Sequence, residues 1–229
     1  GCIPSKALLE SSEQFEHAAN SLKDHGINVG QPELDLGKML KRKDRVVQTL
    51  TKGVASLFKK HSITHVQGRG SLTEAGHVLV TSDKQEQELQ AANVIIATGS
   101  SSATLPGIDF EPGKVDSSTE ALGYEQVPEK LAVIGAGYIG IELGSVWRRL
   151  GAEVTVLEYL DRVLPGMDRD LGSEAHKLLK KQGMKFQLGS RVTGVASDGA
   201  GVKIELGEGG PVKADRVLMA VGRKPNSAG

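Results

Sequence analysis

The amino-acid sequence predicts an α/β fold with a parallel sheet in its second half. An apolar run at 130–135 is followed by a glycine-containing loop, a helical pattern and a second apolar run at 153–158. Strand, loop, helix and strand in this order form a βαβ unit, whose two strands lie parallel. The first sixty residues instead carry apolar side chains at helical spacing, and short strand-like runs begin at residue 63.

Composition excludes several classes of protein. The 229 residues suffice for one large domain or two small ones. Lys plus Arg equals Asp plus Glu at 28 each, so the basic excess of a nucleic-acid-binding protein is absent. No signal peptide and no apolar run of roughly 18 residues is found, so we expect no membrane span. We predict no metal site.

Two helices are expected before residue 63. Pro4 fits the first turn of a helix, where its missing N–H costs little. Gly26 is a suitable stop for this helix, and Asp35 is a good N-cap for the second one. The apolar positions of the two helices recur at helical spacing: Leu8, Phe15, Ala18, Ala19 and Leu22 in the first, and Leu36, Met39, Leu40, Val47, Leu50, Val54, Leu57 and Phe58 in the second.

The remaining elements are predicted from alternating or continuous apolar runs bounded by turn residues. The first group of strands is expected at 63–67, 77–81 and 93–98, and the turn-rich stretch 106–114 is expected to be a linker. After the βαβ unit, a helix is predicted over roughly 170–182. Further strands are predicted at 185–189, 191–197, 202–206 and 214–222, with a small antiparallel meander around 191–213.

A glycine pattern marks the βαβ unit as a candidate dinucleotide site. Gly135, Gly137 and Gly140 form G-x-G-x-x-G between strand and helix, and Glu158 ends the next strand, 18 positions after Gly140. The helix N-terminus then faces the pyrophosphate. Glu158 would accept hydrogen bonds from the adenosine ribose and repel a 2′-phosphate, which favours NAD over NADP. The alternative is a glycine turn beside a solvated glutamate.

Three other features remain open on chemistry alone. The Thr98–Gly99–Ser100 stretch and the Gly68–Gly70 stretch each follow a predicted strand, and each fits a simple turn as well as a ligand contact. Cys2 is the one cysteine in the sequence. Near a helix N-terminus and Lys6 it suits a reactive thiolate, but a small buried apolar residue is equally consistent. One cysteine excludes a disulfide within this chain and suits a reducing compartment, or a chain whose partner cysteine is missing.

Several motifs together resemble a known family. These are "GCIPSKALL", "VIIATGS", "VIGAGYIGIELGSVWRRLGAEVTVLE", "RVLPGMD" and "VGRKPN". The first is similar to the second half of the redox motif of the pyridine-nucleotide disulfide oxidoreductases. The combination, which covers essentially the whole chain, most resembles the dihydrolipoamide dehydrogenase branch of that family.

The resemblance implies roles for individual residues. Cys2 resembles the second redox cysteine, whose thiolate lies against the flavin, Lys6 the lysine near the flavin's reactive edge, and Glu142 the glutamate that pairs with this lysine. Tyr138 resembles the ring that swings aside for the nicotinamide, or it simply packs. The other implied FAD contacts are Gly70, Thr98, Gly99 and Ser100, and the implied NAD contacts are Gly135, Ala136, Gly137, Tyr138, Ile139, Gly140, Ile141, Glu142, Glu158, Val192 and Gly222.

The resemblance also implies organisation and activity. Residues 1–113 would be an incomplete FAD domain of two helices and a β-meander, and 114–229 a nearly complete, Rossmann-like NAD domain. The implied reaction is FAD-dependent oxidation of protein-bound dihydrolipoamide with hydride transfer to NAD. The implied partners are a lipoyl domain and the acyltransferase core of a 2-oxoacid dehydrogenase complex, with a homodimer formed through a C-terminal domain. The compartment would be bacterial cytoplasm or mitochondrial matrix.

The chain is expected to be the middle of a longer protein and inactive alone, because the family's first cysteine, its catalytic histidine and its first glycine motif have no match in the sequence. Two alternatives remain. One is another NAD(P)H-dependent disulfide or mercuric reductase, against which Glu158 argues although Arg162 is basic. The other is a non-catalytic NAD-binding module, against which Cys2 and Lys6 argue.

Overall fold

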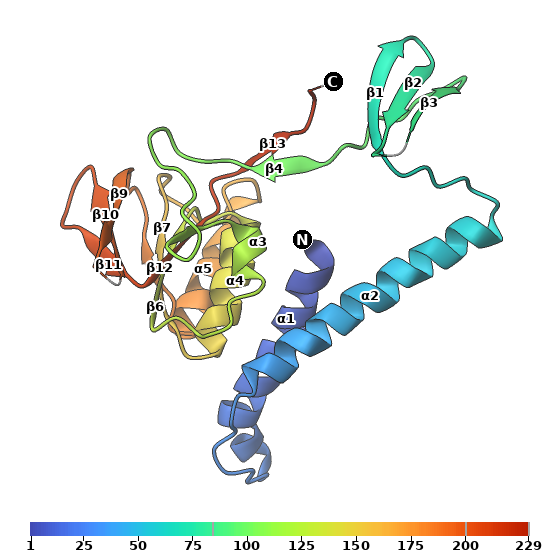
Figure 1. The fold of residues 1–229 in the computed structure, drawn as a ribbon. Coiled ribbons are helices and arrows are strands. Elements are labelled where there is room, and N and C mark those ends of the chain that lie inside the picture. Colours follow the sequence, from blue (N-terminus) through green and yellow to red (C-terminus); the bar gives the residue numbers. More distant parts are fainter. Residues whose placement is uncertain (84, 200, 229) are drawn as a thin grey trace. The chain divides into compact units, whose positions relative to one another are not determined.

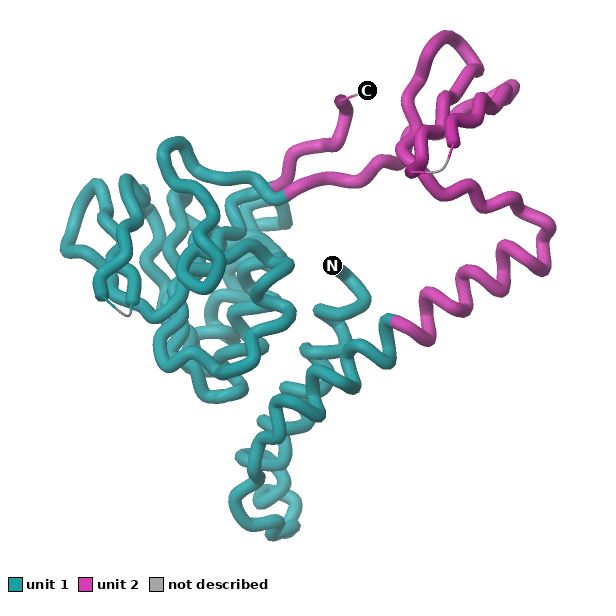
Figure 2. The backbone as a smooth tube through the Cα atoms, viewed as in Figure 1, with its two compact units in different colours: residues 1–47, 102–222 teal, residues 48–101, 223–229 magenta. Residues whose placement is uncertain are grey.

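The computed structural model describes residues 1–83, 85–199 and 201–228. The chain divides into two compact units (Figure 2): unit 1 comprises residues 1–47 and 102–222, and unit 2 comprises residues 48–101 and 223–229. The predicted domains, 1–113 and 114–229, were defined by the cofactor that each would bind, whereas these units are defined by compactness. The domain boundary at residue 113 therefore stays a prediction.

Unit 1 contains a five-stranded sheet in the order β5-β12-β6-β7-β8, in which every paired neighbour is parallel. Helix α4 connects β6 to β7, and α5 connects β7 to β8 (Figure 1). The bounds are β5 Val115–Asp116, β6 Lys130–Ile134, α4 Tyr138–Arg149, β7 Glu153–Leu157, α5 Arg169–Lys181, β8 Lys185–Gln187 and β12 Arg216–Met219. The predicted α/β class and parallel sheet are confirmed.

A smaller antiparallel sheet, in the order β11-β10-β9, is inserted between β8 and β12. Its strands are β9 Val192–Asp198, β10 Gly201–Leu206 and β11 Val212–Ala214. Val202 and Ile204 are almost completely buried and pack with residues of the parallel sheet in one apolar cluster. This sheet confirms the meander predicted around 191–213.

The N-terminal helical segment is α1, Cys2–Glu16, which continues through a π-helical turn at His17–Ser21 and a 3₁₀ turn at Leu22–His25. Gly26 ends it with φ +75°, a left-handed conformation that suits glycine. Helix α2, Leu36–Lys60, follows Asp35, whose Oδ1 accepts the Lys38 N–H at 2.8 Å. Both predicted helices, their stop and their cap are confirmed.

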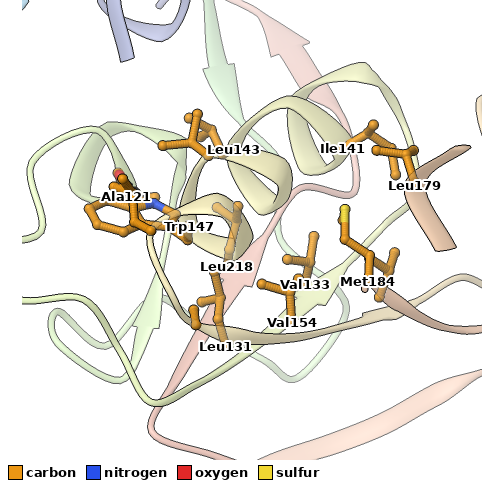
Figure 3. Close-up of a cluster of buried hydrophobic side chains, with 14 of the residues drawn as sticks. Ala121, Leu131, Val133, Ile141, Leu143, Trp147, Val154, Leu179, Met184 and Leu218 are labelled. Atoms are coloured by element: carbon orange, nitrogen blue, oxygen red, sulfur yellow. Dashed lines mark hydrogen bonds between the residues drawn. The ribbon is translucent and has the colours of Figure 1, made fainter. Parts of the chain in front are cut away.

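The core of unit 1 lies where α1 and α4 pack with the parallel sheet. Figure 3 shows Trp147 and Leu143 of α4 together with Leu131 and Val133 of β6 in this cluster. The Trp147 ring is fully buried, and its Nε1–H donates to the Ala121 carbonyl at 3.1 Å, so its polar atom is satisfied. This packing holds the N-terminal end of α4 in place relative to α1.

The linker predicted at 106–114 and the residues after it, up to β6, contain defined local structure. Ile108 is buried, and isolated bridges join Leu105 to Ile108 and Glu111 to Val115. Helix α3, Ser118–Ala121, begins with a capping box in which Ser117 and Glu120 bond reciprocally. Its turns agree with the turn-rich sequence of 106–114.

Unit 2 contains an antiparallel meander of β1 Arg69–Glu74, β2 His77–Thr81 and β3 Glu86–Gln90. It also contains the pair formed by β4, Ser100–Ser102, and β13, Arg223–Pro225. Ser102 itself belongs to unit 1. The β2 prediction at 77–81 is confirmed.

The strands predicted at 63–67 and 93–98 are wrong. Both segments are irregular, and Ile63, Ile95 and Ile96 are exposed. A strand needs a partner for its backbone hydrogen bonds, and in the described part of the chain neither segment has one. The polar sequences of β1 and β3 form strands instead, because each is joined to β2 by a short turn that brings it into register.

Among the described residues, no helix is both long and apolar enough to cross a membrane.

Candidate functional site

The loop between β6 and α4 places two glycines where no side chain fits. Gly135 has φ +103°, and a Cβ on it would lie 2.5 Å from the Ala220 carbonyl oxygen at the end of β12. A Cβ on Gly140 would overlap the Gly135 carbonyl oxygen and lie 3.0 Å from Val133 Cγ1. The fold of the chain itself therefore requires glycine at both positions.

Gly137 differs from its two neighbours in the motif. It is the N-cap of α4 with φ −72°, and among the described residues no atom beyond its own chain neighbours lies within 4 Å of where its Cβ would stand. In the same part of the chain, no side chain caps this helix end by a hydrogen bond. The N-terminal N–H groups of α4 are thus available to an anion, and the space beside Gly137 would allow a pyrophosphate to approach the backbone.

Glu158 follows β7 and is only 8% exposed. Its Oε2 accepts the Ala136 N–H of the glycine loop at 2.7 Å, and its Oε1 accepts the Leu160 N–H at 2.8 Å. The solvated glutamate considered as an alternative is therefore wrong, because the carboxylate is buried and bonded. Each carboxylate oxygen has a second lone pair, which leaves acceptor capacity for a ribose hydroxyl.

Arg162 is the basic residue that weakens the preference for NAD. Its Nη2 donates to the Pro165 carbonyl at 2.8 Å, so the guanidinium is engaged in its own turn. The negative charge nearest the glycine loop is that of Glu158, which bonds the loop directly. This arrangement supports discrimination against a nucleotide with a 2′-phosphate.

The implied contacts Val192 and Gly222 each lie two residues after a backbone hydrogen bond to the strands that flank this loop. Ser190, two residues before Val192, donates its N–H to the Glu158 carbonyl at 2.8 Å. Ala220, two residues before Gly222, closes over Gly135 and donates its N–H to Ile134 at 2.8 Å. The fold thus gathers residues from four separate stretches at the carboxyl end of the parallel sheet.

Helix α1 is tied to α4 by an ion pair. Lys6 Nζ lies 2.5 Å from Glu142 Oε1, and the two side chains are 60% and 28% exposed. The Ser5 hydroxyl is 3.4 Å from Glu142 Oε2 and 3.2 Å from the Cys2 carbonyl oxygen. The structure brings together the two residues that the resemblance pairs, and it adds Ser5, which the motif analysis overlooked although it is adjacent to Lys6.

Cys2 is the first residue of α1 and is exposed. It stands one helical turn before Lys6, so both side chains share a face of α1. Tyr138 stands likewise one turn before Glu142 at the start of α4 and is 60% exposed. The buried-cysteine alternative is wrong, and packing does not account for the Tyr138 ring. Ile139 is half-buried, whereas Ala136 and Ile141 are buried and contribute backbone rather than side chain to this surface.

The remaining implied contacts lie in unit 2. Gly99 has φ +77°, and the Thr98–Gly99–Ser100 turn is bonded to Asn226 and Arg223. Gly70 lies in β1, where a Cβ would meet Val78 Cγ1 at an ordinary 3.5 Å. A side chain would fit at position 70, as it would at Gly137, so packing within the chain does not require glycine at either position. At Gly99 the left-handed backbone explains the glycine.

The whole chain, residues 1–229, matches the family model described as "Pyridine nucleotide-disulphide oxidoreductase". The chain belongs to this family. Family membership gives a common context to the features described above: the glycine loop, Glu158, Cys2 and the Lys6–Glu142 pair.

Curated relatives in the family match over the full chain. The mitochondrial dihydrolipoyl dehydrogenase of Pisum sativum is 43% identical and the dihydrolipoyl dehydrogenase 3 of Pseudomonas putida is 48% identical. The leghemoglobin reductase of Vigna unguiculata is 45% identical. Each comparison covers 100% of this chain but 47%, 50% and 45% of the relative, respectively. The chain therefore spans about half the length of the curated relatives it matches.

Solved structures in the family support the same fold. The flavoprotein disulfide reductase RclA of Escherichia coli has a TM-score of 0.80 at 27% identity, covering 100% of this chain and 48% of RclA. LpdA of Mycobacterium tuberculosis has a TM-score of 0.88 at 23% identity, covering 100% of this chain and 50% of LpdA. The second likeness concerns fold alone.

Dihydrolipoyl dehydrogenases of this family use FAD and NAD. The residues present fit a dinucleotide, because the uncapped end of α4, the open space at Gly137 and the acceptor capacity of Glu158 match a pyrophosphate and a ribose. For the flavin, the exposed Cys2 and Lys6 lie in unit 1, and Gly70 and the Thr98–Ser100 turn lie in unit 2. Each of these groups is accessible to a ligand.

Proposed function

We propose that this chain belongs to a dihydrolipoyl dehydrogenase, which oxidises protein-bound dihydrolipoamide and reduces NAD. The strongest support is the ion pair that connects the helix beginning at Cys2 to the helix that follows the glycine loop. Cys2 and Lys6 of α1 are tied through Glu142 to α4, whose N-terminus is the glycine loop. A module that only bound NAD would need neither the exposed thiol nor the ion pair.

In the proposed reaction, Cys2 alternates between disulfide and thiolate. A disulfide joins Cys2 to another cysteine, and a dihydrolipoyl thiolate attacks the sulfur of that other cysteine, so that Cys2 leaves as a thiolate carrying the electron pair. The second lipoyl thiol then displaces that other cysteine, which closes the lipoyl disulfide and leaves the pair reduced. Cys2 is the single cysteine of this sequence, so the other sulfur lies outside it.

FAD, when bound, would supply the redox chemistry that links Cys2 to NAD. The residues of this chain supply position and charge around that chemistry. Lys6 places a positive charge one turn from Cys2. Glu142 fixes the direction of the Lys6 side chain. Gly137 and the first N–H groups of α4 would bind the NAD pyrophosphate, and Glu158 its adenosine ribose.

The proposed ligand sets follow the resemblance. Gly70, Thr98, Gly99 and Ser100 would contact FAD together with Lys6. Val192, Gly222 and the segment from Gly135 to Glu142 would contact NAD, and Tyr138 would cover the nicotinamide position until the nucleotide enters. Residues 1–113 and 114–229 would form the respective domains.

The partners and compartment are proposed at the same level. The lipoyl domain and acyltransferase core of a 2-oxoacid dehydrogenase complex would supply the substrate, and the active protein would be a homodimer. Curated relatives include several named as mitochondrial and several from bacteria, which supports a matrix or cytoplasmic location.

Two measurements test the proposal. The first is calorimetric titration of the 229-residue chain with NADH and then NADPH, where we expect saturable NADH binding that is clearly tighter than NADPH binding. The second is NAD reduction by dihydrolipoamide with the full-length protein and its Cys2→Ser variant, where the variant should lose turnover. A folded chain that binds neither nucleotide, or a Cys2→Ser variant that keeps full turnover, would contradict the proposal.

A further inference from the structure

We propose that Asn226 is a positioning residue, which holds the Thr98–Gly99–Ser100 turn in the shape that a flavin nucleotide requires. The inference rests on the proposed function, which assigns this turn to FAD. All of the residues involved belong to unit 2.

Asn226 uses its side chain and its backbone to bind this stretch of chain. The Thr98 hydroxyl donates to the Asn226 carbonyl, and Asn226 Nδ2 donates to the Thr98 carbonyl at 3.1 Å. The Asn226 N–H donates to the Gly99 carbonyl at 3.0 Å. The Ser101 hydroxyl donates to Asn226 Oδ1 at 2.6 Å. A single residue thus contacts three of the four residues from 98 to 101.

Arg223 completes the set by binding the fourth residue. Its Nε donates to the Ser100 hydroxyl oxygen at 2.7 Å, and its Nη2 donates to the Ser100 carbonyl. Arg223 begins β13 and Asn226 follows its end. Residues 98–101 are therefore bonded from one short segment that is more than 120 positions away in the sequence.

The turn depends on these bonds because its own surroundings give it little order. The preceding residues 93–97 belong to no strand, and Gly99 adopts a left-handed conformation, φ +77°, in which glycine is the most permissive residue. Bonds that order such a turn before a ligand arrives reduce the conformational cost of binding.

The same bonds determine which hydroxyl groups can serve a ligand. Thr98 has one hydroxyl hydrogen and donates it to Asn226, so toward a ligand the Thr98 oxygen is left as an acceptor. Ser100 accepts from Arg223 and keeps its own hydrogen, so it can donate to a phosphate or carbonyl oxygen. Loss of the Asn226 side chain would remove the Nδ2 donor to the Thr98 carbonyl and the acceptor of the Ser101 hydroxyl, and so loosen the stretch of chain that presents these hydroxyl groups.

The test compares Asn226→Ala, Asn226→Asp and Ser101→Ala with Lys224→Ala, a change at an exposed residue of the neighbouring strand β13, in the full-length protein. Three quantities are measured: the FAD dissociation constant, the visible circular dichroism of the flavin at saturation, and hydrogen exchange of residues 98–101. We expect Asn226→Ala to weaken FAD binding about tenfold, to alter the flavin dichroism and to speed exchange, because both hydrogen bonds of the Asn226 side chain, to the Thr98 carbonyl and from the Ser101 hydroxyl, are lost at once.

Variants that remove only one of the hydrogen bonds separate the individual contributions. Asn226→Asp keeps the acceptor for Ser101 and loses the donor to Thr98, so its effect should be intermediate, whereas Lys224→Ala should bind FAD as the parent does. Ser101→Ala removes one bond, and its effect should not add to that of Asn226→Ala, because both changes act through the same contact. It also serves as the test if Asn226→Ala fails to fold.

Two results would overturn the inference in distinguishable ways. Faster exchange at 98–101 with unchanged FAD affinity and dichroism would mean that Asn226 serves only local structure, and the proposed function would stand. A folded parent protein that binds no FAD would overturn both this inference and the flavin part of the proposed function.

Discussion

Lys6 and Glu142 are 136 residues apart in the sequence, and their charged groups lie 2.5 Å apart in the fold. This pair joins the helix that begins with Cys2 to the helix that begins with the dinucleotide loop. It is partly exposed, and exposed ion pairs contribute little to stability. Its value is therefore positional, which leads to the first prediction.

Breaking this pair should reduce turnover far more than stability. We expect Lys6→Met and Glu142→Gln each to lower the free energy of unfolding by less than about 1 kcal/mol. Turnover of the full-length protein with dihydrolipoamide should fall at least about tenfold, because Lys6→Met removes the charge beside Cys2 and Glu142→Gln removes the partner that fixes its direction. Denaturant unfolding and steady-state kinetics measure the two effects.

A matched control for this prediction is Lys177→Met. Lys177 pairs with Glu174 at 3.2 Å on the surface of α5, and this pair should affect neither quantity. If Lys6→Met and Lys177→Met behaved alike in turnover, the proposed role of the pair would be wrong.

Gly137→Ala should separate folding from nucleotide binding. The position has an ordinary φ of −72° and open space around a Cβ, so the melting temperature should stay within about 2 °C of the parent value. NADH should bind at least about tenfold more weakly, since a methyl group would occupy the path of the pyrophosphate. Thermal melting and calorimetric titration of the chain provide both numbers.

Gly140→Ala is the contrasting variant. A Cβ there overlaps the Gly135 carbonyl and meets Val133, so the variant should lose roughly 2–4 kcal/mol of stability. For the first variant, Gly137→Ala, unchanged NADH binding would contradict the proposal that a pyrophosphate binds at the N-terminus of α4.

Changes at Glu158 should affect nucleotide choice and loop stability to different degrees. Glu158→Ala leaves the Ala136 and Leu160 N–H groups without their acceptor, at roughly 1–3 kcal/mol for the buried Ala136 group and less for the partly exposed Leu160 group. Glu158→Gln keeps one carbonyl oxygen and removes the charge, so it should lose less stability. It should also narrow the preference for NADH over NADPH.

The Glu158→Gln variant is thus the cleaner test of nucleotide choice. Parallel titrations with NADH and NADPH, read beside melting curves, measure both effects. A preference for NADH that survives the loss of the charge would show that another residue sets it.

Tyr124→Phe should make the free energy of unfolding less dependent on pH above about pH 10. Burial raises the pKa of the Tyr124 phenol, with the nearby Asp116 carboxylate as a further cause. Because the folded-state pKa lies above the unfolded value of about 10, the contribution is complete below pH 10 and is lost as pH rises further. The ionised form accumulates in the unfolded chain and pulls the equilibrium toward it.

In the described part of the structure the Tyr124 hydroxyl has no hydrogen-bond partner, so its removal should change stability at pH 7 by less than about 1 kcal/mol. Urea unfolding at pH 7 and at pH 10.5–11.5 gives the comparison. Equal loss of stability in parent and variant across the alkaline range would contradict this assignment.

Local sequence signals predicted the parts of the fold whose partners are close along the chain. The βαβ unit from 130 to 158 was recognisable because its strands, glycine loop and helix are consecutive. Gly26 and Asp35 were recognisable as helix ends because a stop and a cap act on their own backbone. The segments 63–67 and 93–98 failed because an apolar run indicates only a capacity for pairing, and no partner strand meets them in the described residues.

The α/β class, the spacing of the glycine motif and the acidic residue after the second strand follow from the amino-acid sequence, because these depend on short-range periodicity and backbone freedom. Only the folded chain shows that Gly137 faces open space while Gly135 and Gly140 leave no room for a side chain, that Glu158 is bonded to the loop, and that Asn226 binds residues 98–101. The contacts of Gly135, Glu158 and Asn226 join stretches of chain that are between 22 and 128 residues apart. Their geometry exists only after the core has packed, so no local pattern carries it.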